Sequence, residues 1–289
     1  MPPQTLELPV PTWQQSVGKY LKILRVSLIE RLTYRADFFV STFLRFLPLL
    51  TTFLLWEAVF GSAKTPEGEP VKEISGFSHD QMLAYLLLVQ ISRMFSSMPG
   101  LASGISRDIR DGNLKKYLLQ PIDMIAYLIS YRGAHKIAYI ATSAVPYGIL
   151  FFFFRDKFHD MPDLTTWAAY LASLIMGFMV GFFFEAVVGM AGFWLLEVTS
   201  LLYIIHTLNF IISGHMFPLD LLHPALADFL KLLPFQYLAY FPAMIFLGKI
   251  QGQELAIGLA VEFAWAFGLF LTSRYLYRVG LRRYSAYGG

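Results

Sequence analysis

Long apolar stretches that contain no charged residue constrain this chain more than any other feature. They occupy residues 46–56, 137–154, 164–184 and 198–219. Several reach the length of ~20 residues that a helix needs to cross a bilayer. Only 15% of the 289 residues are charged and 56% are hydrophobic, whereas an ordinary soluble domain carries about 25% charge. The sequence therefore predicts an all-α polytopic membrane protein.

Six membrane-spanning helices account for the apolar pattern. We expect them at residues 37–60, 80–103, 133–154, 165–187, 190–213 and 254–275. Fifteen Lys or Arg lie before the first span, between the second and third spans, or after the last, and six lie in the other connections. Because basic residues accumulate on the cytoplasmic side of membrane proteins, we expect both termini to be cytoplasmic.

The N-terminal region differs from the spans. Residues 1–12 are rich in proline and are predicted to form a disordered tail. Apolar residues recur from Trp13 at steps of three and four, with basic residues on the other faces, which predicts an amphipathic helix at 13–36. We expect this helix to lie in the membrane interface, and residues 37–289 to form the transmembrane domain. Packing of the helix against soluble protein is the alternative.

The segment 214–248, between the fifth and sixth spans, is apolar but broken by four prolines. Proline disrupts helix interiors, and unpaired backbone is not tolerated against lipid. Its thirteen-residue apolar part, Phe235–Leu247, would reach only about 20 Å as a helix. We therefore predict a re-entrant or surface-lying helix pair on the outer face. A seventh span is the alternative.

The longest cytoplasmic connection, residues 104–132, has the pattern of a docking loop. Gly112 is expected to end the preceding helix, and Asn113 to cap a short following helix that Pro121 stops. The apolar residues on one side of this short helix are Leu114, Tyr117 and Leu118. Such a face suits a groove on a partner protein. Packing against lipid headgroups is the alternative.

Four segments of the chain occur in an order that carries a family resemblance. They are ERLTYRADF (Glu30–Phe38), DGNLKKYLLQPID (Asp111–Asp123), AGFWLLE (Ala191–Glu197) and the outer run that begins with FPLD at Phe217. Together they resemble the membrane subunit of bacterial type-2 ATP-binding-cassette (ABC) transporters, in which the ATPase is a separate subunit. The resemblance covers nearly the whole chain after about residue 15.

The resemblance implies a function and a set of partners. Two six-span permeases pair as a homodimer or heterodimer in the bacterial inner membrane, and each rests its coupling loop on an ABC ATPase subunit. ATP and Mg would be bound by that ATPase, and no cofactor, metal or nucleic acid is expected in this chain. The pair would export a hydrophobic or amphipathic substrate. The implied ATPase contacts are Asp111, Gly112, Asn113, Leu114, Tyr117, Leu118 and Pro121, and the implied outer gate is Pro218, Pro234, Phe235 and Pro242.

Three polar residues inside the predicted spans are candidates for a translocation pathway. Arg45 and Arg93 fall at similar depths in the first two spans, and Asn209 lies in the fifth. A charge at such depth is costly and usually faces the bundle interior or a watery cavity. We expect the arginines to favour an anionic or amphipathic substrate. A structural pair with Glu185 or Glu197, or snorkelling to an interface, is the alternative.

Two other function classes remain to be weighed. A secondary transporter needs ion-coupling carboxylates at the midplane and broken helices in both halves, and the sequence breaks are concentrated in one half. An intramembrane enzyme is less well supported, because the chain has no HExxH or GxSxG motif. Asp108–Gly112 is similar to the start of the aspartate motif of CDP-alcohol phosphotransferases, but the residues that follow differ. The chain also has no phosphate loop, so another polypeptide would have to bind ATP.

Overall fold

The computed structural model describes residues 13–33, 35–64, 69, 71–158, 162–195 and 198–284. The described chain is mostly helical, with one small antiparallel hairpin in which Glu73 pairs with Ser78. The longer elements are α1 (Trp13–Thr33), α2 (Arg35–Ser62), α3 (His79–Ser96), α4 (Leu101–Arg110), α6 (Met124–Phe153), α7 (Leu164–Met190), α8 (Thr199–Ile212) and α11 (Gly252–Arg283). The shorter ones are β1 (Glu73–Ile74), β2 (Phe77–Ser78), α5 (Lys115–Leu118), η1 (Arg155–Lys157), η2 (Ala191–Phe193), η3 (Leu219–Leu221), α9 (Pro224–Lys231), η4 (Pro234–Leu238) and α10 (Tyr240–Phe246).

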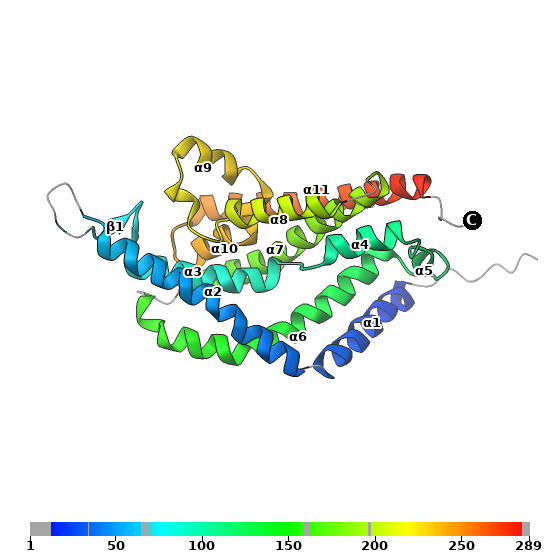
Figure 1. Cartoon of the computed structure of the whole chain (residues 1–289), viewed down its shortest axis with the longest axis horizontal. Helices are drawn as coiled ribbons and strands as arrows, with labels where there is room; N and C mark the ends of the chain where they lie inside the picture. Colours follow the sequence, from blue (N-terminus) through cyan, green and yellow to red (C-terminus); the bar gives the residue numbers. More distant parts are fainter. Residues whose placement is uncertain are drawn as a thin grey trace, which may run out of the picture.

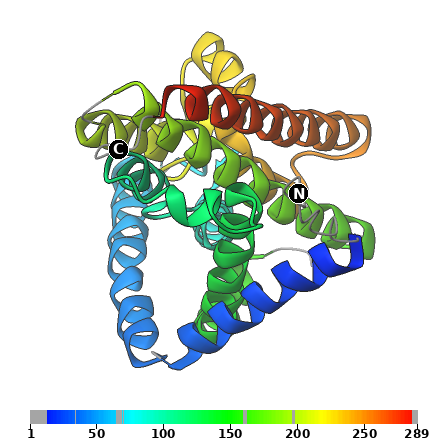
Figure 2. The same cartoon turned by 90° about the vertical axis from the view of Figure 1, so that its right-hand side faces the viewer.

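The long helices run along the length of the molecule, and the short elements gather at its two ends (Figure 1). The start of α1, the short helix α5 and the end of α11 lie together at the right-hand end. The β hairpin and α9 lie at the opposite end. Helix α1 packs along α6. Figure 2, in which the right-hand end of Figure 1 faces the viewer, shows α1 along one edge of the bundle.

Helix α7 is central and contacts α3, α4, α10 and α11. Glycines allow these helices to approach closely. A β-carbon on Gly181 would lie 2.1 Å from the carbonyl oxygen of Ser96 in α3, and one on Gly189 would lie 2.8 Å from that of Ala102 in α4. Small residues at helix contacts are typical of membrane bundles, and these two glycines allow α3 and α4 to approach the backbone of α7 closely.

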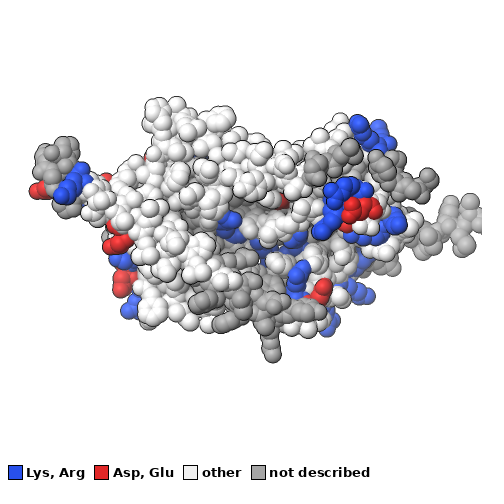
Figure 3. Space-filling view, in the orientation of Figure 1, with Lys and Arg blue, Asp and Glu red and all other residues white. Residues whose placement is uncertain are grey.

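Within the part of the chain that the structure describes, three helices are long and apolar enough to cross a membrane by length and composition. They are the stretches Met124–Phe153, Leu164–Phe193 and Gly252–Arg283, and shorter apolar helices occur at Leu47–Ser62 and Thr199–Ile212. Large apolar side chains on these helices point outward, among them Phe153 and Phe263. In Figure 3, most of the surface between the two ends of the face in view is uncharged. The Lys and Arg side chains on this face are concentrated at the right-hand end, and a few lie in a hollow at the centre. These features are those of a multi-pass membrane protein.

Two of the expected spans differ from the structure. The stretch predicted as one helix at 80–103 is divided, because α3 ends at Ser96 and α4 starts at Leu101. Pro99 and Gly100 form the turn between them, with Gly100 at φ +73°. The stretch predicted at 190–213 begins as a helix only at Thr199, since α7 runs on to Met190 and the short turn η2 follows. At 14 residues, α8 extends about 21 Å, less than the ~30 Å of hydrocarbon.

The other predicted helices are confirmed as helices. Helices α1 and α2 match the expected segments 13–36 and 37–60, and α6, α7 and α11 match the third, fourth and sixth spans. Helix α6 starts nine residues earlier than expected, at Met124, because Asp123 caps it. The segment 214–248 forms α9 and α10, of eight and seven residues, which are both far too short to cross a bilayer.

Candidate functional site

The loop after α4 turns on Gly112, as the sequence predicts. Gly112 has φ +73°, and the backbone N–H of Asn113 donates to the carbonyl of Asp108 at 2.9 Å. This bond pattern is the usual glycine-based stop of a helix. The prediction that Asn113 caps the next helix is wrong. Helix α5 starts at Lys115 without a side-chain cap, and Asn113 completes the turn instead.

Only part of the predicted docking face of α5 points outward. Leu114 and Tyr117 are buried in this chain's own core, and the Tyr117 ring lies 5.5 Å from that of Tyr127. Leu118 is half exposed, whereas Leu119, which directly follows α5, is 82% exposed. Asp111, Asn113 and Pro121 are also exposed, and Gly112 is partly so. Lys115, Lys116 and Gln120 are exposed as well. We call the part of this outward surface formed by Asp111, Asn113, Leu118, Leu119 and Pro121 the coupling surface. The prediction that Leu114 and Tyr117 point outward is wrong.

An ion pair at the surface holds the loop in place in addition to the buried packing. Lys116 pairs with Asp108 at 2.7 Å, which ties α5 to α4. Burial, and after it the nearby carboxylate of Asp108, raise the pKa of the Tyr117 hydroxyl above its ordinary value. Tyr117 therefore stays neutral at physiological pH. These contacts hold the loop as a fixed element of the chain.

Asp123 connects the end of this loop to three helices. One carboxylate oxygen accepts from the backbone N–H of Ala126 at 2.9 Å and caps α6, and the other pairs with Arg274 of α11 at 2.6 Å. The backbone N–H of Asp123 donates to the Tyr20 hydroxyl of α1 at 3.0 Å. Lys19 of α1 also donates to the carbonyl of Pro121. A displacement of α5 would therefore reach α1, α6 and α11 through one residue.

The break between α3 and α4 is supported by two cations of α6. The ammonium of Lys136, itself buried, donates to the carbonyl of Met94 at 2.7 Å and to that of Ser97. Arg132 donates to the carbonyl of Pro99 at 2.8 Å. A helix C-terminus leaves carbonyls without intrahelical donors and carries partial negative charge. Lys136 and Arg132 supply both the donors and the positive charge that this end requires.

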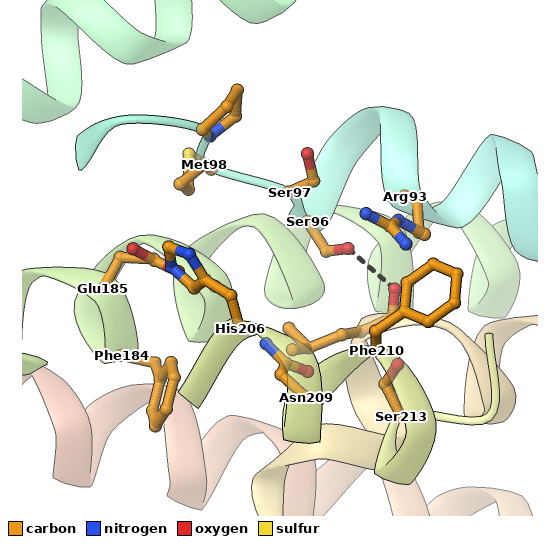
Figure 4. A pocket seen from close by; sticks show the side chains of 13 residues that line it. Arg93, Ser96, Ser97, Met98, Phe184, Glu185, His206, Asn209, Phe210 and Ser213 are labelled. Atoms are coloured by element: carbon orange, nitrogen blue, oxygen red, sulfur yellow. Dashed lines mark hydrogen bonds and ion pairs between the residues drawn. The ribbon is translucent and has the colours of Figure 1, made fainter. Parts of the chain in front are cut away.

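A cavity of about 240 Å³ lies beside this break. Its lining comes from α3 and the break (Arg93, Ser96, Ser97, Met98, Pro99), from α7 (Gly181, Phe184, Glu185), from α8 (His206, Asn209, Phe210), from Ser213, which ends α8, and from Leu238. Leu238 belongs to the segment 214–248, which we call the outer segment after its predicted position. Figure 4 shows Arg93 and Glu185 on opposite sides of the space. Two of the three pathway candidates, Arg93 and Asn209, are thus brought together. Non-helical backbone at membrane depth is tolerated where it lines such a cavity.

Arg93 does not form the predicted pair with Glu185, because Glu185 pairs with His206. The distance from the His206 Nε2 to the Glu185 Oε1 is 2.8 Å. Arg93 instead holds its guanidinium carbon 5.2 Å from the centre of the Phe210 ring. The side chain of Arg45 and all of Glu197 lie outside the described residues, so the predicted meeting of Arg45 with Arg93 stays a prediction. Among the described residues, no group of three His, Asp or Glu gathers to hold a metal.

The outer segment is held by a buried hydrogen bond to α3 and by a partly buried polar network of its own. The Tyr85 hydroxyl of α3 donates to the carbonyl of Gly214. Asp220 accepts from the Tyr240 hydroxyl and from the ammonium of Lys231, both at 2.7 Å. This network links the start of the segment to α10. The segment is therefore a packed part of the bundle.

The four predicted gate residues lie in this segment at helix starts or first turns. Pro218 precedes η3, Pro234 begins η4, and Pro242 is the third residue of α10. Proline is tolerated there because the first turn lacks intrahelical partners for its N–H groups. Phe235 packs edge-on against Phe184 at 5.1 Å, next to the cavity. Whether these residues form a gate stays a prediction.

A helical bundle of this kind, with outward apolar faces and a polar cavity at a broken helix, has the features of a multi-pass membrane protein. Residues 46–288 match the family described as ABC-2 family transporter protein. The chain therefore belongs to the ABC-2 family of transporters, as its sequence resemblance predicts. Comparison with curated proteins finds no match.

Proposed function

We propose that this chain is the permease subunit of an ATP-driven exporter, which pairs with a second permease and with two ABC ATPase subunits. It would move a hydrophobic or amphipathic substrate out of the cytoplasm, and ATP and Mg would be bound by the ATPase. The observation that carries this proposal is the family match over residues 46–288. The chain would cross the bacterial inner membrane six times, with both termini in the cytoplasm.

The coupling surface is the part of the chain suited to the ATPase. It exposes Leu118 and Leu119 beside the exposed Asp111 and Pro121. It lies at the end of the molecule where α1 begins and α11 ends (Figure 1). The Asp123 junction behind it offers a route by which motion of α5 reaches three helices.

The pathway would run along the face that carries the cavity. The hollow in Figure 3 lies on the face where α8 and α2 flank the bundle, and Arg93 and Asn209 belong to the cavity lining. A second permease facing this side would close the hollow into a shared channel. The outer segment, which contributes Leu238 to the lining, would narrow the exit at the far end.

The test is purification of the full chain from its native membrane with its partners. A polypeptide that hydrolyses ATP should accompany the wild-type chain. Leu119→Glu should lose it, because the substitution places a charge on the coupling surface. The matched control is Leu164→Glu, since Leu164 is 85% exposed and starts α7 at the opposite end. The proposal fails if no ATPase accompanies the wild-type chain, or if Leu119→Glu retains it fully.

A further inference from the structure

We propose that Glu262 of α11 is a proton-binding site, and that the proton it holds keeps α11 packed against α7 and against η4 of the outer segment. The group that carries the proton is a carboxyl buried where these three elements meet. The inference goes beyond the proposed function, because it requires no ATPase, no substrate and no second permease.

Glu262 lies on the buried stripe of a helix that otherwise faces largely outward. The buried residues of α11 are Glu262, Ala266, Ser273, Tyr277 and Gly280. Glu262 is 0% exposed, whereas Phe263, which follows it, is 62% exposed. Glu262 is ten residues beyond Gly252, the first residue of α11, or about 15 Å along the helix axis. In a helix that crosses ~30 Å of hydrocarbon, this depth is remote from either surface.

Among the described residues, no cation lies close enough to balance an ionised Glu262. Helix α11 packs against α7, η2 and η4, and Phe241 of α10 lies against its Gly258. These four elements contain no Lys, Arg or His. The basic residues of α11 begin at Arg274, twelve residues beyond Glu262 and about 18 Å along the axis. Both carboxyl oxygens of Glu262 are shielded from solvent and have no hydrogen-bond partner in the described part of the chain.

The polar groups that face Glu262 are hydroxyls. The Ser173 hydroxyl of α7 is close enough to act on the carboxyl, although it forms no aligned hydrogen bond with it. The charge of an ionised Glu262 would reach the Tyr237 hydroxyl of η4, and a tyrosine stays neutral below about pH 10. The acidic residue of α7, Glu185, is twelve residues beyond Ser173 and pairs at the cavity. The other acidic residue of α11, Glu254, is exposed in its first turn.

This burial requires the neutral acid. Removing an ionised carboxylate from water without a partner is so costly that the group binds a proton instead. A neutral carboxylic acid can also donate a hydrogen bond, which a carboxylate cannot. Gly177 of α7 leaves room for an acceptor. A β-carbon there would lie 2.9 Å from the carbonyl oxygen of Tyr237 and 3.8 Å from Oε1 of Glu262. The acid and the carbonyl of η4 therefore border the same small space beside α7.

Loss of the proton would place a full negative charge where α7, α11 and η4 meet. The charge would repel the carbonyl oxygen of Tyr237 and would draw water into an apolar contact. We expect α11 to loosen from both neighbours as a result. Because Leu238 of η4 lines the cavity, the change would reach the cavity wall.

The first test is infrared spectroscopy of the full-length chain in phosphatidylcholine nanodiscs at about pH 7, where an ordinary glutamate is ionised. A protonated carboxyl has a C=O stretch that is separate from the bands of a carboxylate. The wild type should show such a stretch, and Glu262→Gln should remove it. The matched control is Glu254→Gln, which should keep it. Identical spectra of the wild type and Glu262→Gln in this region would overturn the inference.

Thermal unfolding at several pH values gives the second readout. The unfolded chain releases the proton above the ordinary glutamate pKa of about 4.3, whereas the folded chain keeps it. The folded state then binds one proton more, so Glu262 lowers the stability as the pH rises, by about tenfold in the unfolding equilibrium per pH unit. Glu262→Gln should lose this contribution, and Glu254→Gln should retain it. Equal pH dependence of the wild type and Glu262→Gln would contradict the proposal.

A third measurement needs no variant and therefore holds even where Glu262→Gln does not fold. Dicyclohexylcarbodiimide is an apolar reagent that modifies protonated carboxyls, because the carboxyl oxygen bonds to its central carbon and the carboxyl proton passes to one of its nitrogens. Mass spectrometry of the treated wild type should find the reagent on Glu262 and not on Glu254. Modification of Glu254 alone would refute the site. Stabilisation of the wild type by Na⁺ at constant pH and ionic strength would also refute it, since a metal cation would then occupy the place of the proton.

Discussion

Asp123 gives the most quantitative test of how the end of the molecule that carries the coupling surface is held together. Its carboxylate caps α6 and pairs with Arg274 across to α11, while its backbone N–H binds Tyr20. Asp123→Ala removes the first two contacts and keeps the third. Loss of an N-cap costs about 1 kcal/mol. The side chains of the ion pair are each 32% exposed, so solvent screening limits that pair to about 0.5–1 kcal/mol.

The sum, about 1.5–2 kcal/mol, corresponds to a melting temperature lowered by about 3–8 °C, at the ~2–4 °C per kcal/mol of the larger single domains. Asp123→Asn should fall between the wild type and alanine, because asparagine caps a helix about as well as aspartate but carries no charge. Asp156→Ala is the control, since its contact with Arg155 is 3.6 Å long and largely exposed. Thermal unfolding of the purified chain in detergent, followed by intrinsic fluorescence, measures all three. If alanine and asparagine at position 123 give equal losses, the capping argument is refuted.

Three further substitutions test the packing around the cavity by the same unfolding assay. Gly181→Ala should lower the free energy of unfolding by about 3 kcal/mol or more, because its methyl group would overlap the backbone of α3. The control Gly268→Ala, whose methyl group meets open space, should not destabilise the chain. Equal melting temperatures of the two variants would contradict the close packing. Lys136→Met should cost about 1–3 kcal/mol, because it leaves the carbonyls of the α3–α4 break without their donor; an unchanged stability would show that the break needs no cation. Tyr240→Phe should lower the free energy of unfolding by about 1.5–3 kcal/mol through loss of the hydrogen bond to Asp220. Proteolysis of the outer segment should also become faster, and an unchanged rate of proteolysis would contradict this role of Tyr240.

The apolar pattern alone was sufficient to predict the helical class, because membrane spans must be apolar and helical. It could not locate the break after Ser96, since hydropathy is blind to a short turn inside an apolar stretch. The turn signal was present as Pro99-Gly100. The start of the fifth span could not be predicted for a related reason. Met190 ends α7, and Ala191–Phe193 form η2. These residues are apolar, so their composition predicts a continuous span where the packed chain has a turn.

The candidate site was predicted in part. Polarity inside apolar spans singled out Arg93 and Asn209, and both line one cavity. The similar depth of Arg45 and Arg93 stays a prediction. The pair of Glu185 with His206 could not be found in this way, since it depends on how α7 and α8 are rotated. The same limit explains Leu114 and Tyr117. Periodicity groups residues on one side of a helix, but only the packed structure decides which side meets the protein and which meets a partner.

The claim that this permease is driven through its cytoplasmic loop can be tested with one cross-link. Because the chain has no cysteine, Leu119→Cys supplies its single thiol, in the coupling surface. A short bifunctional reagent applied to native membranes should join the chain to an ATP-binding polypeptide, and nucleotide trapping with vanadate should change the yield. A thiol at Leu164 should give no such product. If position 164 captures the ATPase and position 119 does not, the account of the coupling surface is contradicted.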